Sequence, residues 1–188
     1  LEDSRYFVEE VRKKVIKDYG FEKVYKQGFN IKTPIDLKLQ NIATRALRKG
    51  LESYDKRRGW RGPLLNKKKN KEWKKGLEKF NLEKSTGWDL AIVKRVDKFE
   101  AVIETNESKI GIINNEDINW TRKSINEIFK IGDVIYVKKK NEGNYSLKQV
   151  PLANGGIVVM DPYSGRILAM SGGFSFKKSE FNRVTQAL

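Results

Sequence analysis

The chain holds two copies of the pattern Ser-x-x-Lys, in which a lysine amine can take the proton of a serine nucleophile: Ser53 with Lys56, and Ser175 with Lys178. The chain has no histidine and no cysteine, so a catalytic serine would need such a lysine or a carboxylate as its base. Ten serines and 28 lysines in 188 residues give roughly 1.5 such matches by chance. Two matches therefore carry no signal, and we expect neither serine to be catalytic.

Other chemical motifs are incomplete. Ser124-Ile125-Asn126 imitates a Ser-x-Asn element, but no Lys-Thr-Gly strand follows it, and Lys84-Ser85-Thr86-Gly87 has one residue too many. No carboxylate pair stands out among the 24 acidic residues, and no glycine-rich phosphate loop is present. The lack of His and Cys also excludes thiolate zinc sites and imidazole-ligated metals. We expect no catalytic residue, no metal and no cofactor.

The formal net charge of +15 is concentrated in one segment. Residues 56–75 carry ten basic and one acidic side chain, a net of +9, whereas residues 76–150 carry 13 basic and 12 acidic side chains, a net of +1. Lys67 to Lys75 could contact nucleic acid or an anionic surface such as lipid headgroups, or could be a solvated connecting loop. The excess of 28 lysines over 11 arginines favours the loop, because phosphate sites favour the guanidinium fork.

The composition indicates a folded chain with a highly charged surface. Aromatic residues make up 11% of the sequence and charged residues 34%. No apolar run is long enough to span a membrane, and no signal-like segment opens the chain. A start at Leu1 rather than at Met suggests a fragment.

The first third of the chain predicts two helices and a short strand. Apolar residues at helical spacing follow an N-cap at Asp3 or Ser4 and stop at Gly20. Residues 28–33 alternate between apolar and polar and predict a strand. Thr33-Pro34-Ile35-Asp36 matches a capping box with proline at the first helical position, which predicts a longer second helix.

From Asp89 the apolar period changes to two, after a short helix expected over residues 72–83. Five short strands, with a polar stretch at residues 119–126 between the third and the fourth, fit a Greek-key barrel of the OB type. Gly111-Ile112-Ile113 and Ile131-Gly132-Asp133-Val134 resemble the S1 branch of such barrels. The apolar strand positions are Ala91 and Val93, then Phe99, Ala101 and Ile103, then Ile110 and Ile112, then Val134 and Tyr136, and finally Leu147.

The aromatic residues of this barrel have two interpretations. OB folds stack bases on such side chains beside a basic groove, whereas the alternative is packing in the core and at its rim. The near-neutral charge of the barrel segment favours packing. The residues concerned are Phe99, Trp120, Tyr136 and Tyr145.

The residues after Pro151 predict a β-hairpin. Residues 156–160 form a nearly continuous apolar run, Asp161-Pro162-Tyr163-Ser164-Gly165 is a turn, and residues 166–170 form the return strand. A strand that is apolar on both faces needs cover on both, so we expect this hairpin to belong to a larger sheet.

Several phrases, in order along nearly the whole chain, resemble the class A, bifunctional penicillin-binding proteins. The hairpin and the segment after it are similar to the opening of that family's transpeptidase domain, and the first part is similar to its linker between glycosyltransferase and transpeptidase domains. In Gram-negative members an OB-like domain is inserted where residues 88–150 stand. The similar phrases are Tyr6-Phe7-Val8-Glu9-Glu10-Val11-Arg12, Lys32-Thr33-Pro34-Ile35-Asp36-Leu37-Lys38-Leu39-Gln40, Tyr54-Asp55-Lys56-Arg57-Arg58-Gly59-Trp60-Arg61-Gly62-Pro63, the run from Gly155 to Gly173, and Phe181-Asn182-Arg183-Val184-Thr185-Gln186-Ala187.

The resemblance implies a parent enzyme that polymerises lipid II and cross-links it by D-Ala-D-Ala transpeptidation through an acyl-serine that β-lactams block. The family's nucleophilic serine follows the Asn-Arg-x-x-Gln-Ala helix start, so we expect it just after Leu188, and the glycosyltransferase carboxylates before Leu1. By the same resemblance, the parent is anchored by a transmembrane helix on the periplasmic side of the bacterial inner membrane.

We therefore expect an α+β fold, with two N-terminal helices and a short strand packing on a β-hairpin, and with an inserted five-stranded barrel of OB, S1-like type. The expected function is that of a non-catalytic linker with a docking domain for a regulatory protein; in related Gram-negative proteins an outer-membrane lipoprotein activator fills that role. The alternative is a single-stranded nucleic-acid-binding module of S1 type. The expected divisions are 1–66 for the linker, 67–87 for the basic connecting segment, 88–150 for the OB-like domain and 151–188 for the start of the transpeptidase domain.

Overall fold

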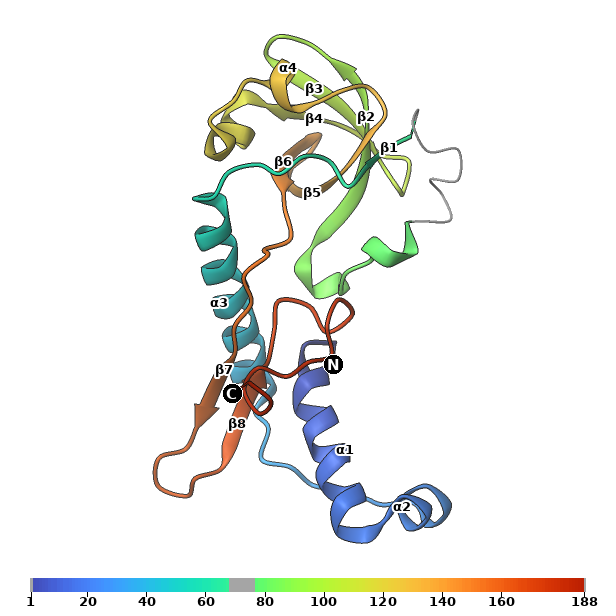
Figure 1. Cartoon of the computed structure of the whole chain (residues 1–188), viewed down its shortest axis with the longest axis vertical. Helices are drawn as coiled ribbons and strands as arrows, with labels where there is room; N and C mark the ends of the chain where they lie inside the picture. The colour runs from blue at the N-terminus through green and yellow to red at the C-terminus, as the bar shows by residue number, and fades with distance from the viewer. Residues whose placement is uncertain (1, 68–76, 188) are drawn as a thin grey trace. The chain divides into compact units, whose positions relative to one another are not determined.

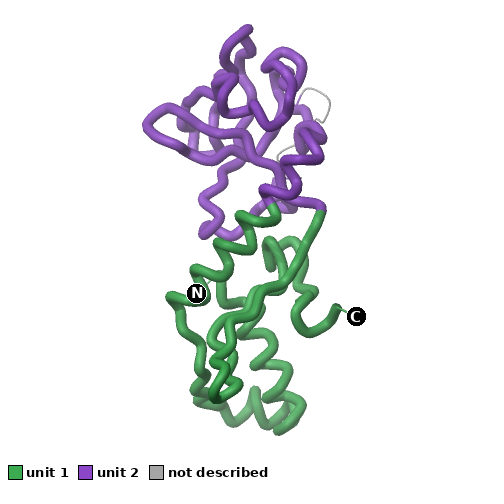
Figure 2. Tube along the Cα trace, turned by 90° about the vertical axis from the view of Figure 1, so that its left-hand side faces the viewer, with its two compact units in different colours: residues 1–51, 153–188 green, residues 52–152 purple. Residues whose placement is uncertain are grey.

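The computed structural model of the chain describes residues 2–67 and 77–187 (Figure 1). The chain folds as two compact units, one made of residues 1–51 and 153–188 and the other of residues 52–152 (Figure 2). The second unit is therefore inserted between two sequence segments of the first. Among the described residues, no helix is long and apolar enough to cross a membrane.

Three α-helices begin the chain. A 3₁₀ turn, η1 (Glu2–Ser4), leads into α1 (Arg5–Tyr19), followed by α2 (Phe21–Gln27) and α3 (Leu37–Lys56). The predicted first helix is confirmed, with Ser4 and Gly20 at its ends. Gly20 has φ +83°, a conformation that a residue with a Cβ rarely adopts, so it ends α1. The sequence did not predict α2, because its Phe21 and Tyr25 remain exposed and form no buried stripe.

The strand predicted over residues 28–33 is wrong. These residues run outside any helix and pair with no strand among the described residues, and Phe29 and Ile31 are 38% and 44% exposed. Apolar alternation alone does not make a strand, because the backbone groups also need a neighbouring strand to bond. The predicted cap at Thr33 is also wrong. Asp36 caps α3, since its Oδ1 accepts hydrogen bonds from the N–H groups of Lys38 at 2.8 Å and Leu39 at 3.0 Å.

The C-terminal hairpin is confirmed. Strands β7 (Ile157–Met160) and β8 (Ile167–Ser171) pair antiparallel, with Val158 opposite Met170. The turn between them is fixed by Asp161, whose backbone N–H donates to Arg166 O and whose carbonyl accepts from Gly165 N. The N–H of Asp36 donates to Leu168 O at 2.9 Å, so the residue that caps α3 also bonds to the backbone of β8.

The inserted unit is a closed β-barrel. Its sheet has the order β1-β5-β2-β3-β4-β6, and a further pairing of β5 with β6 closes it. All pairings are antiparallel except the short contact of β4 with β6. The strands are β1 (Leu65–Asn66), β2 (Trp88–Val96), β3 (Glu100–Thr105), β4 (Ile110–Asn114), β5 (Asp133–Asn141) and β6 (Asn144–Lys148); the short helices are η2 (Glu78–Phe80), η3 (Lys84–Thr86), η4 (Asn115–Thr121) and α4 (Ile125–Ile128).

Alternate residues of each strand fill the barrel, as the period of two predicts, but in β4 the inward positions are Gly111 and Ile113 and not the predicted Ile110 and Ile112. In β3, Ala101 and Ile103 are fully buried while their neighbours are half-exposed. Helices η4 and α4, which connect β4 to β5, add Ile118 and Ile125 to this core. Gly111 of β4 is needed because a Cβ there would lie 2.4 Å from the ring of Tyr145. The inner core consists of Ala91, Val93, Ala101, Ile103, Ile113, Ile118, Ile125, Ile128, Phe129, Ile135, Val137, Tyr145 and Leu147.

The α+β class and the five predicted barrel strands are confirmed, and the structure adds the two-residue strand β1. Phe99 was expected inside β3, but it precedes that strand and is 67% exposed. The expected helix at residues 72–83 falls partly outside the described residues; within them, residues 78–80 form the short 3₁₀ helix η2. Most of the basic segment, residues 68–75, also lies outside the described residues.

Candidate functional site: the base of the barrel and its surfaces

The carboxylate of Asp55 forms hydrogen bonds with the chain segment that enters the barrel and with the segment that leaves it. Asp55 lies in the last turn of α3 and is 1% exposed. Arg61 Nη1 donates to both of its oxygens, at 2.8 and 2.9 Å, and Gln149 Nε2 donates to Oδ2 at 2.8 Å. The N–H of Leu152 donates to Oδ1 at 3.1 Å. A buried carboxylate with an ion pair and these further donors is fully satisfied, and it holds both segments in one place. We call these four residues the Asp55 cluster.

Arg61 and Gln149 are also bonded to each other's segment. The Arg61 N–H donates to Gln149 Oε1 at 2.9 Å, and Arg61 Nη2 donates to the carbonyl of Val150 at 2.7 Å. Gln149 Nε2 reaches the carbonyl of Gly59 at 3.1 Å. Gly59 and Gly62 have φ of +82° and +103°, which lets the chain turn on either side of Arg61. Within the phrase from Tyr54 to Pro63, Asp55 and Arg61 are thus bonded to each other, and Gly59 and Arg61 are bonded to Gln149.

A second ion pair and a pair of tryptophans also involve the end of α3 and the segments beside the Asp55 cluster; we call this region, together with the cluster, the base of the barrel. Lys148 Nζ lies 2.9 Å from Glu52 Oε2, and both side chains are largely buried. Lys56 Nζ lies 5.7 Å from the centre of the Trp120 ring, and Trp60 meets Trp120 edge to face with ring centres 6.0 Å apart. Burial, and next the charge of Lys148, lower the pKa of Lys56.

In the first Ser-x-x-Lys match, the serine and the lysine lie in different surroundings. Ser53 is exposed on α3, while Lys56 is engaged with Trp120. In the second match Ser175 is 3% exposed while Lys178 is exposed; the Ser175 Oγ accepts from the backbone N–H of Lys178, and the Ser175 carbonyl accepts from the N–H of Ser179. Ser53 thus lies on the exposed side of a helix and Ser175 in a buried turn.

The two incomplete motifs, at residues 124–126 and 84–87, form a helix cap and a helical turn. Ser124 caps α4, and Glu127 Oε2 accepts from the Ser124 N–H at 2.7 Å in a capping box. Thr86 Oγ1 donates to the carbonyl of Glu83, and Gly87 ends η3 with φ +65°. Among the described residues, no group of three or more Asp or Glu side chains could hold a metal ion.

The four aromatic residues considered for base stacking do not share a surface. Tyr145 belongs to the inner core, and Tyr136 belongs to a second apolar cluster with Leu90 and Val134, where its hydroxyl donates to the carbonyl of Phe80. Burial raises the pKa of Tyr136 well above its usual range. Trp120 is half-buried against the inner core. Of the four, Phe99 alone is well exposed, which favours packing over base stacking.

In the other unit, a buried glutamine of α3 holds strand β8. Gln40 is fully buried; its Oε1 accepts from the Met170 N–H and its Nε2 donates to the Met170 carbonyl, each at 2.9 Å. Arg48, also on α3, donates to the carbonyl of Phe174 and pairs with Asp3 at 3.0 Å. These contacts fix the hairpin and the residues that follow it onto α3 and η1.

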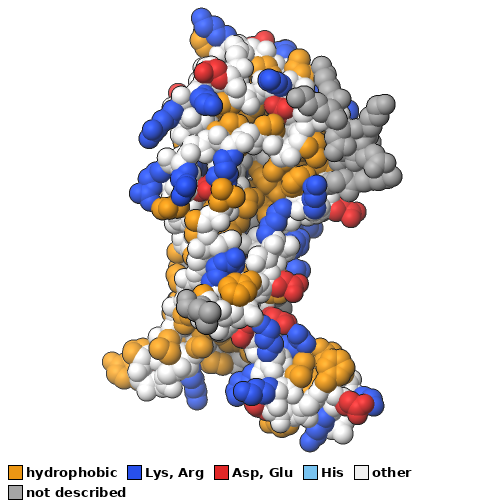
Figure 3. Space-filling model, in the orientation of Figure 1, with side chains coloured by type: hydrophobic (Ala, Val, Ile, Leu, Met, Phe, Trp, Pro, Cys, Tyr) orange, Lys and Arg blue, Asp and Glu red, His pale blue; other side chains and the backbone are white. Residues whose placement is uncertain are grey.

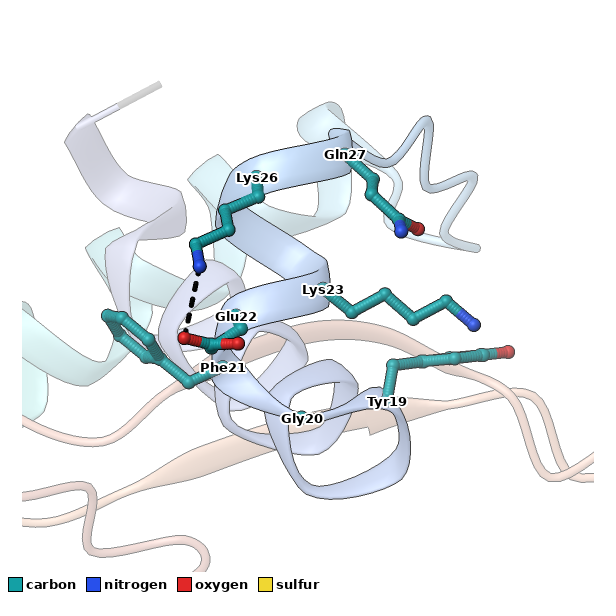
Figure 4. A pocket seen from close by; sticks show the side chains of 7 residues that line it. All are labelled: Tyr19, Gly20, Phe21, Glu22, Lys23, Lys26 and Gln27. Atoms are coloured by element: carbon teal, nitrogen blue, oxygen red, sulfur yellow. Dashed lines mark hydrogen bonds and ion pairs between the residues drawn. The ribbon is translucent and has the colours of Figure 1, made fainter.

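Where α1 meets α2, the exposed rings of Tyr19 and Phe21 extend to opposite sides (Figure 4). Tyr19 and Phe21 flank Gly20 and, with α2, line a shallow pocket of about 450 Å³, in which Lys26 pairs with Glu22 at 3.1 Å. Tyr19, Phe21 and Tyr25 are 53–60% exposed. In the region of α1 and α2, Figure 3 shows hydrophobic side chains among basic and acidic ones. The lining contains no arrangement of groups suited to catalysis.

Comparisons with known proteins identify similar sequences and a similar fold. Residues 60–153 match the family described as penicillin-binding protein OB-like domain. The chain is 38% identical to penicillin-binding protein 1A of Rickettsia prowazekii and 30% identical to that of Pseudomonas aeruginosa, over 97% and 98% of this chain and 24% of each relative. The crystal structure of penicillin-binding protein 1A from Haemophilus influenzae superposes with a TM-score of 0.82 at 32% identity, over 97% of this chain and 28% of that one. The chain thus spans about a quarter of the length of the curated relatives it matches.

Proposed function

Because this chain belongs to the class A penicillin-binding proteins and carries their OB-like domain, we propose that it is the non-catalytic linker and docking region of a bifunctional peptidoglycan synthase. The complete protein would polymerise lipid II and cross-link the product through an acyl-serine that β-lactams block. It would act on the periplasmic side of the inner membrane, anchored by a transmembrane helix.

The observation that carries this proposal is the Asp55 cluster. It holds the barrel to the last turn of α3 through a buried ion pair, in which the side chain of Asp55 is 2% exposed, and through two further donors, Gln149 Nε2 and the N–H of Leu152. The cluster holds the first and the last segment of the barrel unit together, and both segments lead to the rest of the chain, so we propose that they pass on the effect of a partner bound to the barrel.

The surface of the barrel supports a protein as that partner. Phe99, Ile110 and Ile131 lie at or near strand ends and are 67%, 62% and 48% exposed. Contiguous exposed apolar side chains mark surfaces that bind proteins, so these three positions are where we propose to look for contact with a partner. We propose a regulatory protein, such as an outer-membrane lipoprotein activator, as the partner of this domain.

The test uses the full-length protein with residues 64–147 replaced by a short Gly-Ser bridge, which keeps Asp55, Arg61 and Gln149 in place. We expect glycan polymerisation and cross-linking to continue at the basal rate, and stimulation by a purified lipoprotein activator to be lost. Fluorescent penicillin labelling of the variant serves as the control for a folded transpeptidase. Full stimulation of a variant without the barrel would refute the docking role.

A further inference from the structure

A groove of about 400 Å³ opens beside helix α4, on the barrel unit alone. One wall comes from the segment Trp60 to Pro63 and from Asn66, and the other from α4 with the residues on either side of it. We call it the α4 groove. Its volume is within the range of sites for small molecules. Its lining combines apolar side chains, an amide and two ammonium groups: Trp60, Pro63, Asn66, Lys123, Ile128 and Lys130.

The acidic side chains of this groove form hydrogen bonds within the protein, whereas its two lysines form no ion pair among the described residues. Glu127 and Asp133 also line it, but Glu127 caps α4 by accepting from the N–H and hydroxyl of Ser124. Asp133 is 4% exposed, and its oxygens accept from Asn66 Nδ2 and from the Lys130 N–H, both at 2.7 Å. Lys123 and Lys130 are exposed and form no ion pair within the described part of the chain, while the pKa of Glu127 is lowered by its bonds with Ser124 and, further, by the charge of Lys123. The groove therefore offers two ammonium groups to an external anion.

The apolar part of the groove is positioned by the barrel core. Trp60 packs against the inner core and against Trp120, so its ring is held in place before any ligand arrives. The face of an indole is electron-rich and attracts the positively polarised C–H groups on the flat face of a sugar ring. An aromatic surface next to an amide and two cations thus matches a sugar that carries carboxylates.

We propose that the α4 groove binds an acidic glycopeptide of the cell wall, with a sugar ring against Trp60 and the peptide carboxylates at Lys123 and Lys130. This rests on the proposed function, which places the domain among such polymers. The site would let the synthase sense wall material close to its own product.

The test is a titration of the ¹⁵N-labelled chain with the disaccharide-tetrapeptide that a muramidase releases from peptidoglycan. We expect the indole N–H signal of Trp60, assigned with single Trp→Phe variants, to shift and saturate with a dissociation constant on the order of 1 mM or below. The double variant Lys123→Gln/Lys130→Gln should bind about tenfold more weakly. The matched control, Lys138→Gln/Lys139→Gln on β5, removes the same charge outside the groove and should bind as the parent chain does.

Three results would overturn the proposal: no saturable shift of the Trp60 signal, equal weakening by the control variant, or equal affinity for the free tetrapeptide without its sugars. The first would mean no site, the second a general attraction between charges, and the third a site for peptides. None of these results would change the outcome of the activator experiment, so a failure of this proposal can be distinguished from a failure of the proposed function.

Discussion

Asp55 and Gln149 are 94 residues apart in the sequence, yet Gln149 Nε2 lies 2.8 Å from Asp55 Oδ2. This bond joins the last turn of α3 to the residue that follows the final barrel strand. Arg61 completes the arrangement from the other chain segment. The barrel is therefore closed at its base by side chains as well as by strand pairing, and five predictions follow from this structure and its surfaces.

Removing the Asp55 carboxylate should destabilise the barrel. In Asp55→Ala the Arg61 guanidinium and the Gln149 amide lose their acceptor in a mostly buried place, which should cost about 2–4 kcal/mol of unfolding free energy. Urea unfolding followed by tryptophan fluorescence measures this, because all four tryptophans lie between residues 60 and 120. Asp97→Ala, which breaks an exposed pair with Arg95, is the control and should cost less than about 1 kcal/mol. Equal losses in the two variants would contradict the role of the cluster.

A methyl group at Gly111 should also destabilise the barrel. The added Cβ would meet Tyr145 Cε2 at 2.4 Å, so Gly111→Ala should lower the unfolding free energy by about 1–3 kcal/mol. Gly50 in α3 has nothing within 4 Å of a built Cβ, so Gly50→Ala should be neutral or stabilising by up to about 1 kcal/mol. Thermal unfolding of both variants provides the comparison. A neutral Gly111→Ala variant would show that Tyr145 does not pack as described.

The pKa of Asp89 should make stability depend on pH. Burial, and next the charge of Glu107, raise this pKa, so the folded state holds the proton more tightly than the unfolded state. The contribution of Asp89 therefore favours folding at low pH and is lost as the pH rises through the raised pKa. Asp89→Asn should be more stable than the parent chain at pH 7, and the difference should shrink on acidification. Urea titrations across this pH range test it; a difference that grows towards low pH would be inconsistent with a raised pKa.

Nucleic-acid binding should be weak and sensitive to salt. The described barrel has no row of exposed rings, so any attraction for RNA should come from the lysines alone. Fluorescence anisotropy with a short single-stranded RNA should show binding near 50 mM salt that disappears by about 300 mM. Saturable binding at physiological salt would instead favour the S1-type function.

Fluorescent penicillin should not label this chain. Ser175 is 3% exposed, so we expect a β-lactam ring not to reach its hydroxyl. Denaturing gels with in-gel fluorescence, with Ser175→Ala as the control, would detect a covalent adduct. A signal that disappears in Ser175→Ala would show that this serine is reactive.

How much of this fold the sequence predicts depends on the range of the interactions involved. The apolar periods of α1 and of strands β2 to β6 are local, and they predicted these elements because each period matches one repeating geometry. The cap of α3 shows the limit of local patterns: Thr33 and Asp36 both fit a cap, and Asp36 is the one whose carboxylate meets free N–H groups.

By itself, the sequence determined the α+β class, the barrel strands, the hairpin and the family resemblance, since these follow from periodicity and from short phrases of residues. The tertiary structure alone decided that residues 28–33 form no strand and that Asp55 accepts hydrogen bonds from Arg61 and Gln149. It also decided that Lys123 and Lys130 line the same groove as Trp60. These outcomes depend on pairings between residues distant in sequence, and a pairing becomes favourable only when the whole fold brings its partners together and removes their water.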